Sequence, residues 1–140
     1  MKIPRRGFCS LLPLTLLAGR SFAEGETVSS FATRFEDFPV NKRTNAQFRA
    51  IAKGKTPTGE RIELHQTVLE PGAAPHGAHT HAHSEFWLVR EGTIEITIKG
   101  KKTQLGPGSV GFAASNEEHG VRNIGKIPAS YFVIAIGPTA

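Results

Sequence analysis

Sulfur is almost absent from this chain of 140 residues, which has one cysteine, Cys9, and one methionine, Met1. Residues 24–140 contain neither. A segment without cysteine cannot form disulfides, thiolate nucleophiles, iron–sulfur clusters or blue-copper centres. A metal ion bound by this segment must therefore be held by nitrogen and oxygen ligands.

Most of the chain also lacks a surplus of positive charge, although the formal net charge is +5. Four of the 17 basic residues lie in residues 1–23, which contain no acidic residue. Residues 24–140 therefore carry 13 basic and 12 acidic residues. Such a nearly neutral segment is a poor electrostatic match for a phosphate backbone, and we expect no nucleic-acid partner.

Residues 1–23 have the pattern of a signal peptide for export. Basic residues at the start, including Arg5 and Arg6, precede an apolar stretch over residues 8–19 that is too short to span a bilayer. A small residue, Ala23, ends the segment at the expected cleavage point. The segment resembles a bacterial twin-arginine signal, and a general secretory leader is the alternative. Either signal places the mature protein in the periplasm or outside the cell, with no stable membrane anchor after cleavage, and an uncleaved membrane anchor is a third reading of the segment.

The remainder has the pattern of one all-β domain, residues 47–140, preceded by an N-terminal arm, residues 24–46. Short alternating runs of apolar residues are separated by Gly and Pro turns, and their spacing of about 8–12 residues is typical of a small sandwich or barrel. The predicted strands are 48–52, 61–69, 85–90, 93–99, 110–112, 120–123 and 130–136. The arm contains three phenylalanines that we expect to cover a barrel end or a dimer partner, Phe31, Phe35 and Phe38.

Four of the six histidines fall within eight residues, at His76, His79, His81 and His83. Glu85 follows two positions later. Along an extended chain, alternate side chains face the same side, so the last three histidines and the carboxylate would converge. Imidazole nitrogens with one carboxylate suit Mn, Fe, Co, Ni, Cu or Zn. The distant His119 is available as a further ligand, and its context argues against the alternative of an exposed histidine tract that binds metals weakly.

The histidine cluster resembles the first motif of the cupin superfamily. That motif is a glycine, a His-x-His pair, a glutamate and a second glycine, and here these positions are Gly72, His79, His81, Glu85 and Gly92. The gap between the first glycine and the first histidine is one residue longer than usual. The other spacings agree.

The second cupin motif is matched around His119. It begins at Gly108 and ends at Asn123, with Ala114 where the family has a proline and Asn116 where it has a glycine. Asparagine tolerates a left-handed backbone better than most residues, so we expect the turn to survive. The two motifs occur in order and in register.

The resemblance implies a double-stranded β-helix, or jelly-roll barrel, that holds one divalent transition metal ion. The implied ligands are three histidines and one glutamate, His79, His81, Glu85 and His119. The implied function is a metal-dependent enzyme of dioxygenase, decarboxylase or isomerase type acting on a small oxygenated organic substrate. Because cupins host unrelated functions, a non-catalytic small-molecule-binding protein and an envelope metal store or carrier are the alternatives. Small cupins also form dimers, so we expect a homodimer.

The sequence does not identify a catalytic acid or base. His76 and His83 do not match ligand positions and are predicted to lie in a loop or at a rim, and His65 is interpreted as an ordinary strand residue. Arg90 and Arg122 are considered for anion capture, with a solvated surface role favoured. For the phenylalanines among the candidates for the cavity wall, core packing is the preferred interpretation. The six candidates are Phe48, Gln66, Trp87, Phe112, Tyr131 and Phe132.

Overall fold

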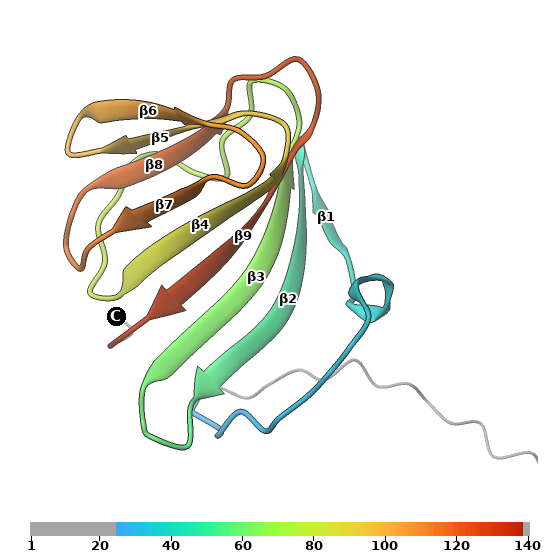
Figure 1. The fold of residues 1–140 in the computed structure, drawn as a ribbon, viewed down its shortest axis with the longest axis vertical. Coiled ribbons are helices and arrows are strands. Elements are labelled where there is room, and N and C mark those ends of the chain that lie inside the picture. The colour runs from blue at the N-terminus through green and yellow to red at the C-terminus, as the bar shows by residue number, and fades with distance from the viewer. Residues whose placement is uncertain (1–24, 139–140) are drawn as a thin grey trace, which may run out of the picture.

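The computed structural model describes residues 25–138, which form an all-β jelly-roll barrel (Figure 1). A six-stranded sheet in the order β1-β2-β3-β9-β4-β7 faces a three-stranded sheet in the order β6-β5-β8. Neighbouring strands pair antiparallel throughout both sheets. The strands are β1 (Asn41–Arg43), β2 (Ala46–Lys55), β3 (Arg61–Leu69), β4 (Ser84–Glu91), β5 (Ile94–Ile98), β6 (Lys101–Leu105), β7 (Val110–Ala113), β8 (His119–Asn123) and β9 (Ala129–Ile136).

All seven predicted strands are present, and the range predicted for β3 agrees with the observed one. The sequence analysis missed β1 and β6. Both are edge strands, and all of their side chains except Leu105 are exposed, so neither carries an apolar alternation. β1 lies inside the segment predicted as the N-terminal arm.

The hydrophobic core lies between the two sheets. Its largest buried side chains are Trp87, Tyr131 and Leu69 from the six-stranded sheet, together with Ile94 and Ile96 from the three-stranded sheet. Burial of a large apolar side chain contributes roughly 1.5–3 kcal/mol, so this pairing of faces is the main source of stability.

The more polar face of β3 points into the barrel. Its residues pair in register with β9, and paired residues on an antiparallel ladder share a face. His65 and Thr67 pair with Val133 and Tyr131, and all four side chains border the internal cavity. Ile62 and the other alternate residues of the strand therefore face outward.

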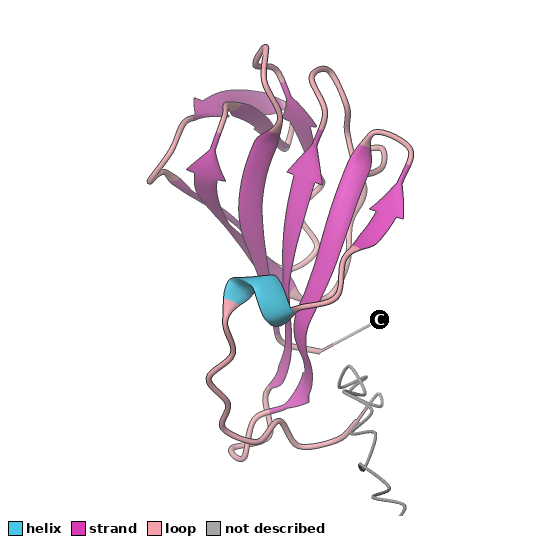
Figure 2. Cartoon of the chain, turned by 90° about the vertical axis from the view of Figure 1, so that its right-hand side faces the viewer, coloured by secondary structure: helices cyan, strands magenta, loops and turns pink. Residues whose placement is uncertain are grey.

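The N-terminal arm packs on the outer face of its own sheet through η1 (Phe35–Asp37), as Figure 2 shows. The Phe35 ring meets Phe132 edge to face at 6.4 Å, and the guanidinium groups of Arg49 and Arg90 lie 4.5 and 4.7 Å from its centroid. Beneath it, Gln66 is fully buried and accepts a hydrogen bond from Arg49. The single helical turn thus covers the sheet.

No helix in residues 25–138 is long and apolar enough to cross a membrane. The predicted signal peptide, residues 1–23, lies outside the residues that the structure describes.

Candidate metal centre

Two of the predicted ligands are brought together by a backbone bridge. His79 lies in the loop before β4, and His119 is the first residue of β8. The amide of each donates to the carbonyl of the other at 3.0 Å, which forms an isolated antiparallel pair. Paired residues share a face, so their imidazole centroids lie only 4.8 Å apart.

The other two predicted ligands close the cluster. One ring nitrogen each from His79, His81 and His119 lie within 4.8 Å of one another. The two carboxylate oxygens of Glu85 lie 3.1 Å from Nε2 of His81 and 3.6 Å from Nε2 of His119. The structure therefore brings all four side chains to one place, from the loop before β4, from β4 and from β8.

Backbone carbonyls orient two of the imidazoles. Nδ1 of His81 lies 2.9 Å from the carbonyl of His83, and Nδ1 of His119 lies 2.8 Å from the carbonyl of Glu117. Since a carbonyl only accepts, each Nδ1 carries a proton, which leaves Nε2 as the nitrogen of each ring that is available to the cluster. Such contacts hold metal-binding imidazoles in place in known sites.

Three ring nitrogens of these histidines are buried and form no hydrogen bond with the described residues. They are Nε2 of His81, Nε2 of His119 and Nδ1 of His79. Burial first, and then the neighbouring histidines, lower the pKa of His79 below its ordinary value, which keeps its ring neutral. A buried polar atom without a partner costs roughly 1–3 kcal/mol. Converging imidazole nitrogens beside a carboxylate fit a divalent transition metal ion, which would satisfy all of them.

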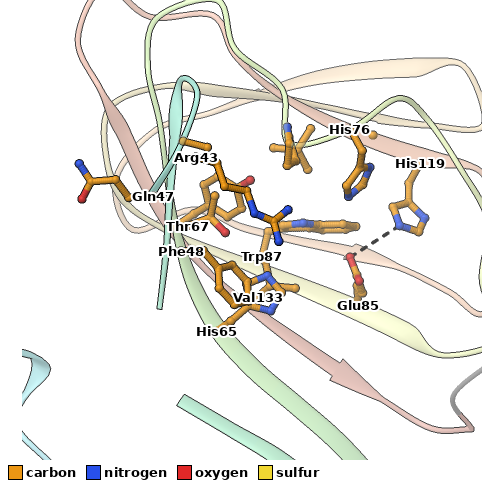
Figure 3. Close-up of a pocket in the computed structure, with 15 residues that line it drawn as sticks. Arg43, Gln47, Phe48, His65, Thr67, His76, Glu85, Trp87, His119 and Val133 are labelled. Carbon is orange, nitrogen blue, oxygen red and sulfur yellow. Dashed lines mark ion pairs between the residues drawn. The ribbon is translucent and has the colours of Figure 1, made fainter. Parts of the chain in front are cut away.

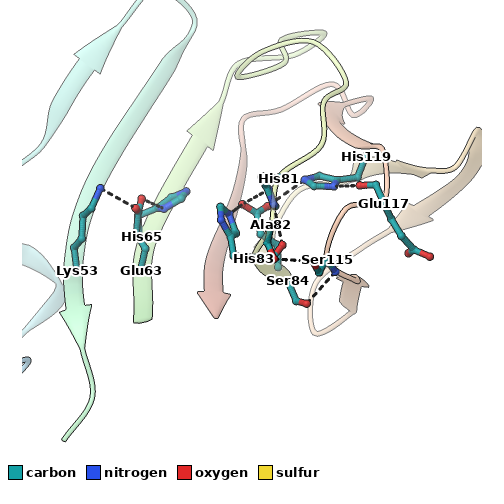
Figure 4. A network of polar contacts seen from close by, with 11 residues as sticks. Lys53, Glu63, His65, His81, Ala82, His83, Ser84, Ser115, Glu117 and His119 are labelled. Carbon is teal, nitrogen blue, oxygen red and sulfur yellow. Dashed lines mark hydrogen bonds and ion pairs between the residues drawn. The ribbon is translucent and has the colours of Figure 1, made fainter. Parts of the chain in front are cut away.

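The turn between β7 and β8 anchors the ligand loop. Asn116 has a φ of 62°, the left-handed conformation expected where the cupin motif has glycine. The backbone amide of Asn116 donates to the carbonyl of His81 at 2.8 Å, and the hydroxyl of Ser115 donates to the carbonyl of Ala82 (Figure 4). The two motifs are therefore linked directly by hydrogen bonds.

The expectation of an extended chain through the histidine cluster is wrong. The residues before Ser84 form a loop, and the rings of His81 and His83 stack at 3.5 Å with an interplanar angle of 15°. Nε2 of His83 donates to Oε1 of Glu85 at 3.2 Å. His83 is therefore a half-buried neighbour of the cluster, and it forms a second, overlapping group with His81 and Glu85.

A cavity of about 200 Å³ adjoins the cluster (Figure 3). Glu85 and His119 border it at one end, and the exposed His76 lies at its rim, as predicted. Three of the six proposed wall residues line it, namely Phe48, Trp87 and Tyr131.

The other three proposed wall residues lie outside the cavity. Gln66 and Phe132 lie under the N-terminal arm, and Phe112 is 48% exposed on the outer face, where its ring packs against Phe86. Period-two alternation separates the two faces of a strand but does not say which one points inward.

Tyr131 presents a neutral hydroxyl group to the cavity. Burial raises the pKa of Tyr131 well above its ordinary value, and a hydrogen bond with Thr67 opposes that shift only in part. At neutral pH the phenol is therefore a hydrogen-bonding group without charge.

Sequence reasoning missed four polar wall residues, of which His65 and Arg43 can carry a positive charge; the others are Gln47 and Thr67. The sequence gives a partial indication that His65 lines the cavity, because this residue shares the inward face of its strand with Thr67. The sequence gives no such indication for Arg43, since this residue lies in a weakly patterned segment. Arg90 and Arg122 do not line the cavity: Arg90 lies over the Phe35 ring, and Arg122 donates to the carbonyl of Gly72 at 3.1 Å.

Fold and site together define a small β-barrel protein whose internal cavity ends at a candidate centre of three imidazoles and one carboxylate. The chain belongs to the cupin family, since residues 65–135 match the family described as Cupin domain.

Comparisons with known proteins agree with this assignment. The chain is 29% identical over 77 residues to a mannose-1-phosphate guanylyltransferase of Klebsiella pneumoniae, and spans only 16% of that protein. An RmlC-like cupin from Shewanella frigidimarina superposes with a TM-score of 0.67 at 15% identity, over 79% of this chain and 93% of the other. A predicted oxalate decarboxylase from Thermotoga maritima superposes with a TM-score of 0.66 at 17% identity, over 77% of this chain and 100% of the other. At these identities the two structures show the fold alone.

Proposed function

We propose that His79, His81, Glu85 and His119 hold one divalent transition metal ion, and that the chain is a metal-dependent enzyme acting on a small oxygenated organic molecule. The observation that carries the proposal is the convergence of unpartnered, buried ring nitrogens on the Glu85 carboxylate. Mn, Fe, Co, Ni, Cu and Zn all suit these donors.

The four side chains would hold the ion, and a metal ion there would supply a Lewis acid for substrate oxygens. The chain's own residues hold the ligand side chains in position. The carbonyls of His83 and Glu117 hold the imidazoles of His81 and His119, and Trp87 packs against the His119 ring at 5.3 Å.

Two observations favour an enzyme over the alternatives of a passive binding protein or a metal store. A partly aromatic cavity beside the cluster suits a small molecule better than a metal store requires. Titratable groups with perturbed pKa values also face the barrel interior, since the pKa of Glu63 is lowered and that of Tyr131 is raised. Groups of this kind gather at catalytic sites.

Metal analysis tests the ligand set. We expect one transition metal ion per chain in protein purified from its native compartment, and a loss of at least roughly tenfold in metal affinity on changing any one ligand to Ala. Glu91→Ala is the matched control, because this carboxylate at the far end of β4 is 65% exposed and belongs neither to the cluster nor to the cavity wall. Unchanged metal content in His79→Ala, His81→Ala, Glu85→Ala and His119→Ala would refute the proposal.

We further propose that the protein works in the periplasm or outside the cell, after export by the twin-arginine route. Support comes from the sequence of residues 1–23 alone. Replacement of Arg5 and Arg6 by Lys should abolish export of a reporter fusion if that route is used, and should leave export intact if the leader is a general secretory signal.

A further inference from the structure

A second group of charged and titratable side chains lies on β2 and β3. Nδ1 of His65 lies 3.4 Å from Oε1 of Glu63, and Nζ of Lys53 lies 3.4 Å from Oε2 of the same carboxylate (Figure 4). The contact with His65, opposed by burial and aided by the charge of Lys53, lowers the pKa of Glu63 to about 2. Glu63 is therefore ionised at neutral pH and attracts the near nitrogen of the imidazole.

Strand register places this group one strand away from the candidate metal centre. Ala135 of β9 pairs with Glu63 on one side and with Glu85 on the other. Paired residues share a face, so both carboxylates lie on the inner face of the sheet. At a strand spacing of about 4.8 Å, their α carbons are about 10 Å apart, with only the methyl group of Ala135 between them.

His65 is the member of this group that borders the cavity. Figure 3 shows it beside Phe48, on the side of the cavity away from His119, and the Phe48 and His65 ring centroids are 4.6 Å apart. Because Nδ1 is turned toward Glu63, Nε2 is the nitrogen left to meet a molecule in the cavity.

Arg43 at the end of β1 adds a permanent positive charge to the same cavity. Glu85 is the only carboxylate among the lining residues described by the structure. A divalent ion at the candidate centre would outweigh that one negative charge, so the cavity would be positive at both ends. A positive cavity with low-dielectric walls concentrates anions.

We propose that Arg43 and His65 bind the carboxylate of a small organic acid whose other end faces the metal centre. The inference rests on the proposed metal site. A guanidinium group binds carboxylates through paired hydrogen bonds. The cavity of about 200 Å³ lies below the roughly 300–1,000 Å³ typical of ligand sites, so the acid is small.

Binding of such an acid places His65 between two carboxylates, that of Glu63 and that of the ligand. This arrangement favours the doubly protonated ring, which donates from both nitrogens. The other charged groups near the ring are Lys53 on β2 and Arg43 on β1, while its partner on β9 is the apolar Val133. The acid should therefore bind together with a proton.

Calorimetry on the metal-loaded full chain tests the anion site. The probes are the dicarboxylates from malonate to adipate, each compared with its half-amide, in which one carboxylate becomes a neutral amide of the same size. We expect at least one dicarboxylate to bind about tenfold more tightly than its half-amide, and Arg43→Met to abolish that preference. Lys42→Met, the exposed neighbour on β1, is the matched control and should retain the preference.

Proton uptake provides the second measurement. Binding heats of the preferred dicarboxylate in buffers of different ionisation enthalpy should report proton uptake, and His65→Gln should abolish the uptake while leaving metal content unchanged. A metal-loaded chain that prefers no dicarboxylate over its half-amide, or a preference that survives Arg43→Met, would overturn the inference. A chain that takes up no metal would instead overturn the proposed function, and metal analysis detects that result separately.

Discussion

Glu63 and Glu85 lie on the same face of one sheet, but their neighbours give the two carboxylates different roles. Glu85 meets three imidazoles at 3.1–3.6 Å. Glu63 meets one imidazole and one lysine, and its pKa falls to about 2. The difference comes from the loop before β4, which brings histidines to one carboxylate and not to the other.

The Glu63 interactions predict a pH-dependent stability. The pKa of Glu63 is about 2 in the fold, compared with an ordinary value of 4.5, so its stabilisation is complete above pH 4.5 and is lost as the pH falls toward 2. At 1.36 kcal/mol per unit the upper limit is about 3 kcal/mol, and screening of a side chain that is 35% exposed reduces it to about 1–2 kcal/mol.

Urea denaturation of Glu63→Gln should therefore show a free energy of unfolding about 1–2 kcal/mol below wild type at pH 7, and a difference less than roughly half as large at pH 3. The exposed Glu118→Gln is the control and should change little at either pH. An equal loss at both pH values would argue against an ionic role for Glu63.

At the scale of elements, the turn between β4 and β5 packs closely against the start of β9. A Cβ atom on Gly92 would lie 2.7 Å from Cα of Ala129 and 2.9 Å from the carbonyl oxygen of Pro128. Gly92 also has a φ of 74°. The first cupin motif therefore needs glycine here for both backbone conformation and close packing.

A matched pair of substitutions separates these two reasons. Gly100→Ala, at a φ of 76° with open space around it, should lower the free energy of unfolding by about 1–2 kcal/mol through backbone strain alone. Gly92→Ala should cost a further 1–3 kcal/mol or so because neighbouring atoms must move. Thermal or urea unfolding measures the free energy of unfolding of both variants. Equal losses would show that the atoms around Gly92 move aside at no cost in free energy.

At the scale of the whole molecule, an apolar strip lies on the outer face of β4 and β7. Leu88, Val110 and Phe112 are 37%, 58% and 48% exposed, and Leu88 pairs with Val110. The N-terminal arm covers the sheet further along, at Phe132. We propose that the strip is the contact of a homodimer, because apolar neighbours on an exposed sheet face mark interaction surfaces.

Light scattering tests the dimer. We expect the wild-type chain to be dimeric at micromolar concentration and Phe112→Glu to be monomeric with unchanged metal content, since burying the introduced charge in a contact is unfavourable. Ile127→Glu, at a residue 61% exposed in the loop before β9, is the control and should remain dimeric. A monomeric wild type, or a dimer that tolerates Phe112→Glu, would contradict this contact.

The sequence by itself predicted seven of the nine described strands and contained the two cupin motifs, whose resemblance implied the four candidate ligands, because these features depend on local spacing and side-chain type. The left-handed turn at Asn116 was predictable for the same reason. The inward orientation of the polar face of β3 was not, because alternation is symmetrical between the two faces of a strand.

Only the tertiary structure decided which side chains share the cavity. His65 and Arg43 are distant in sequence from the ligands and reach the cavity through the pairing of β1, β2, β3 and β9. His83 meets Glu85 because the loop before β4 bends, which alternation along an extended chain does not predict. Contacts of this kind depend on how strands pair and loops close across long separations, and no short stretch of sequence contains that information.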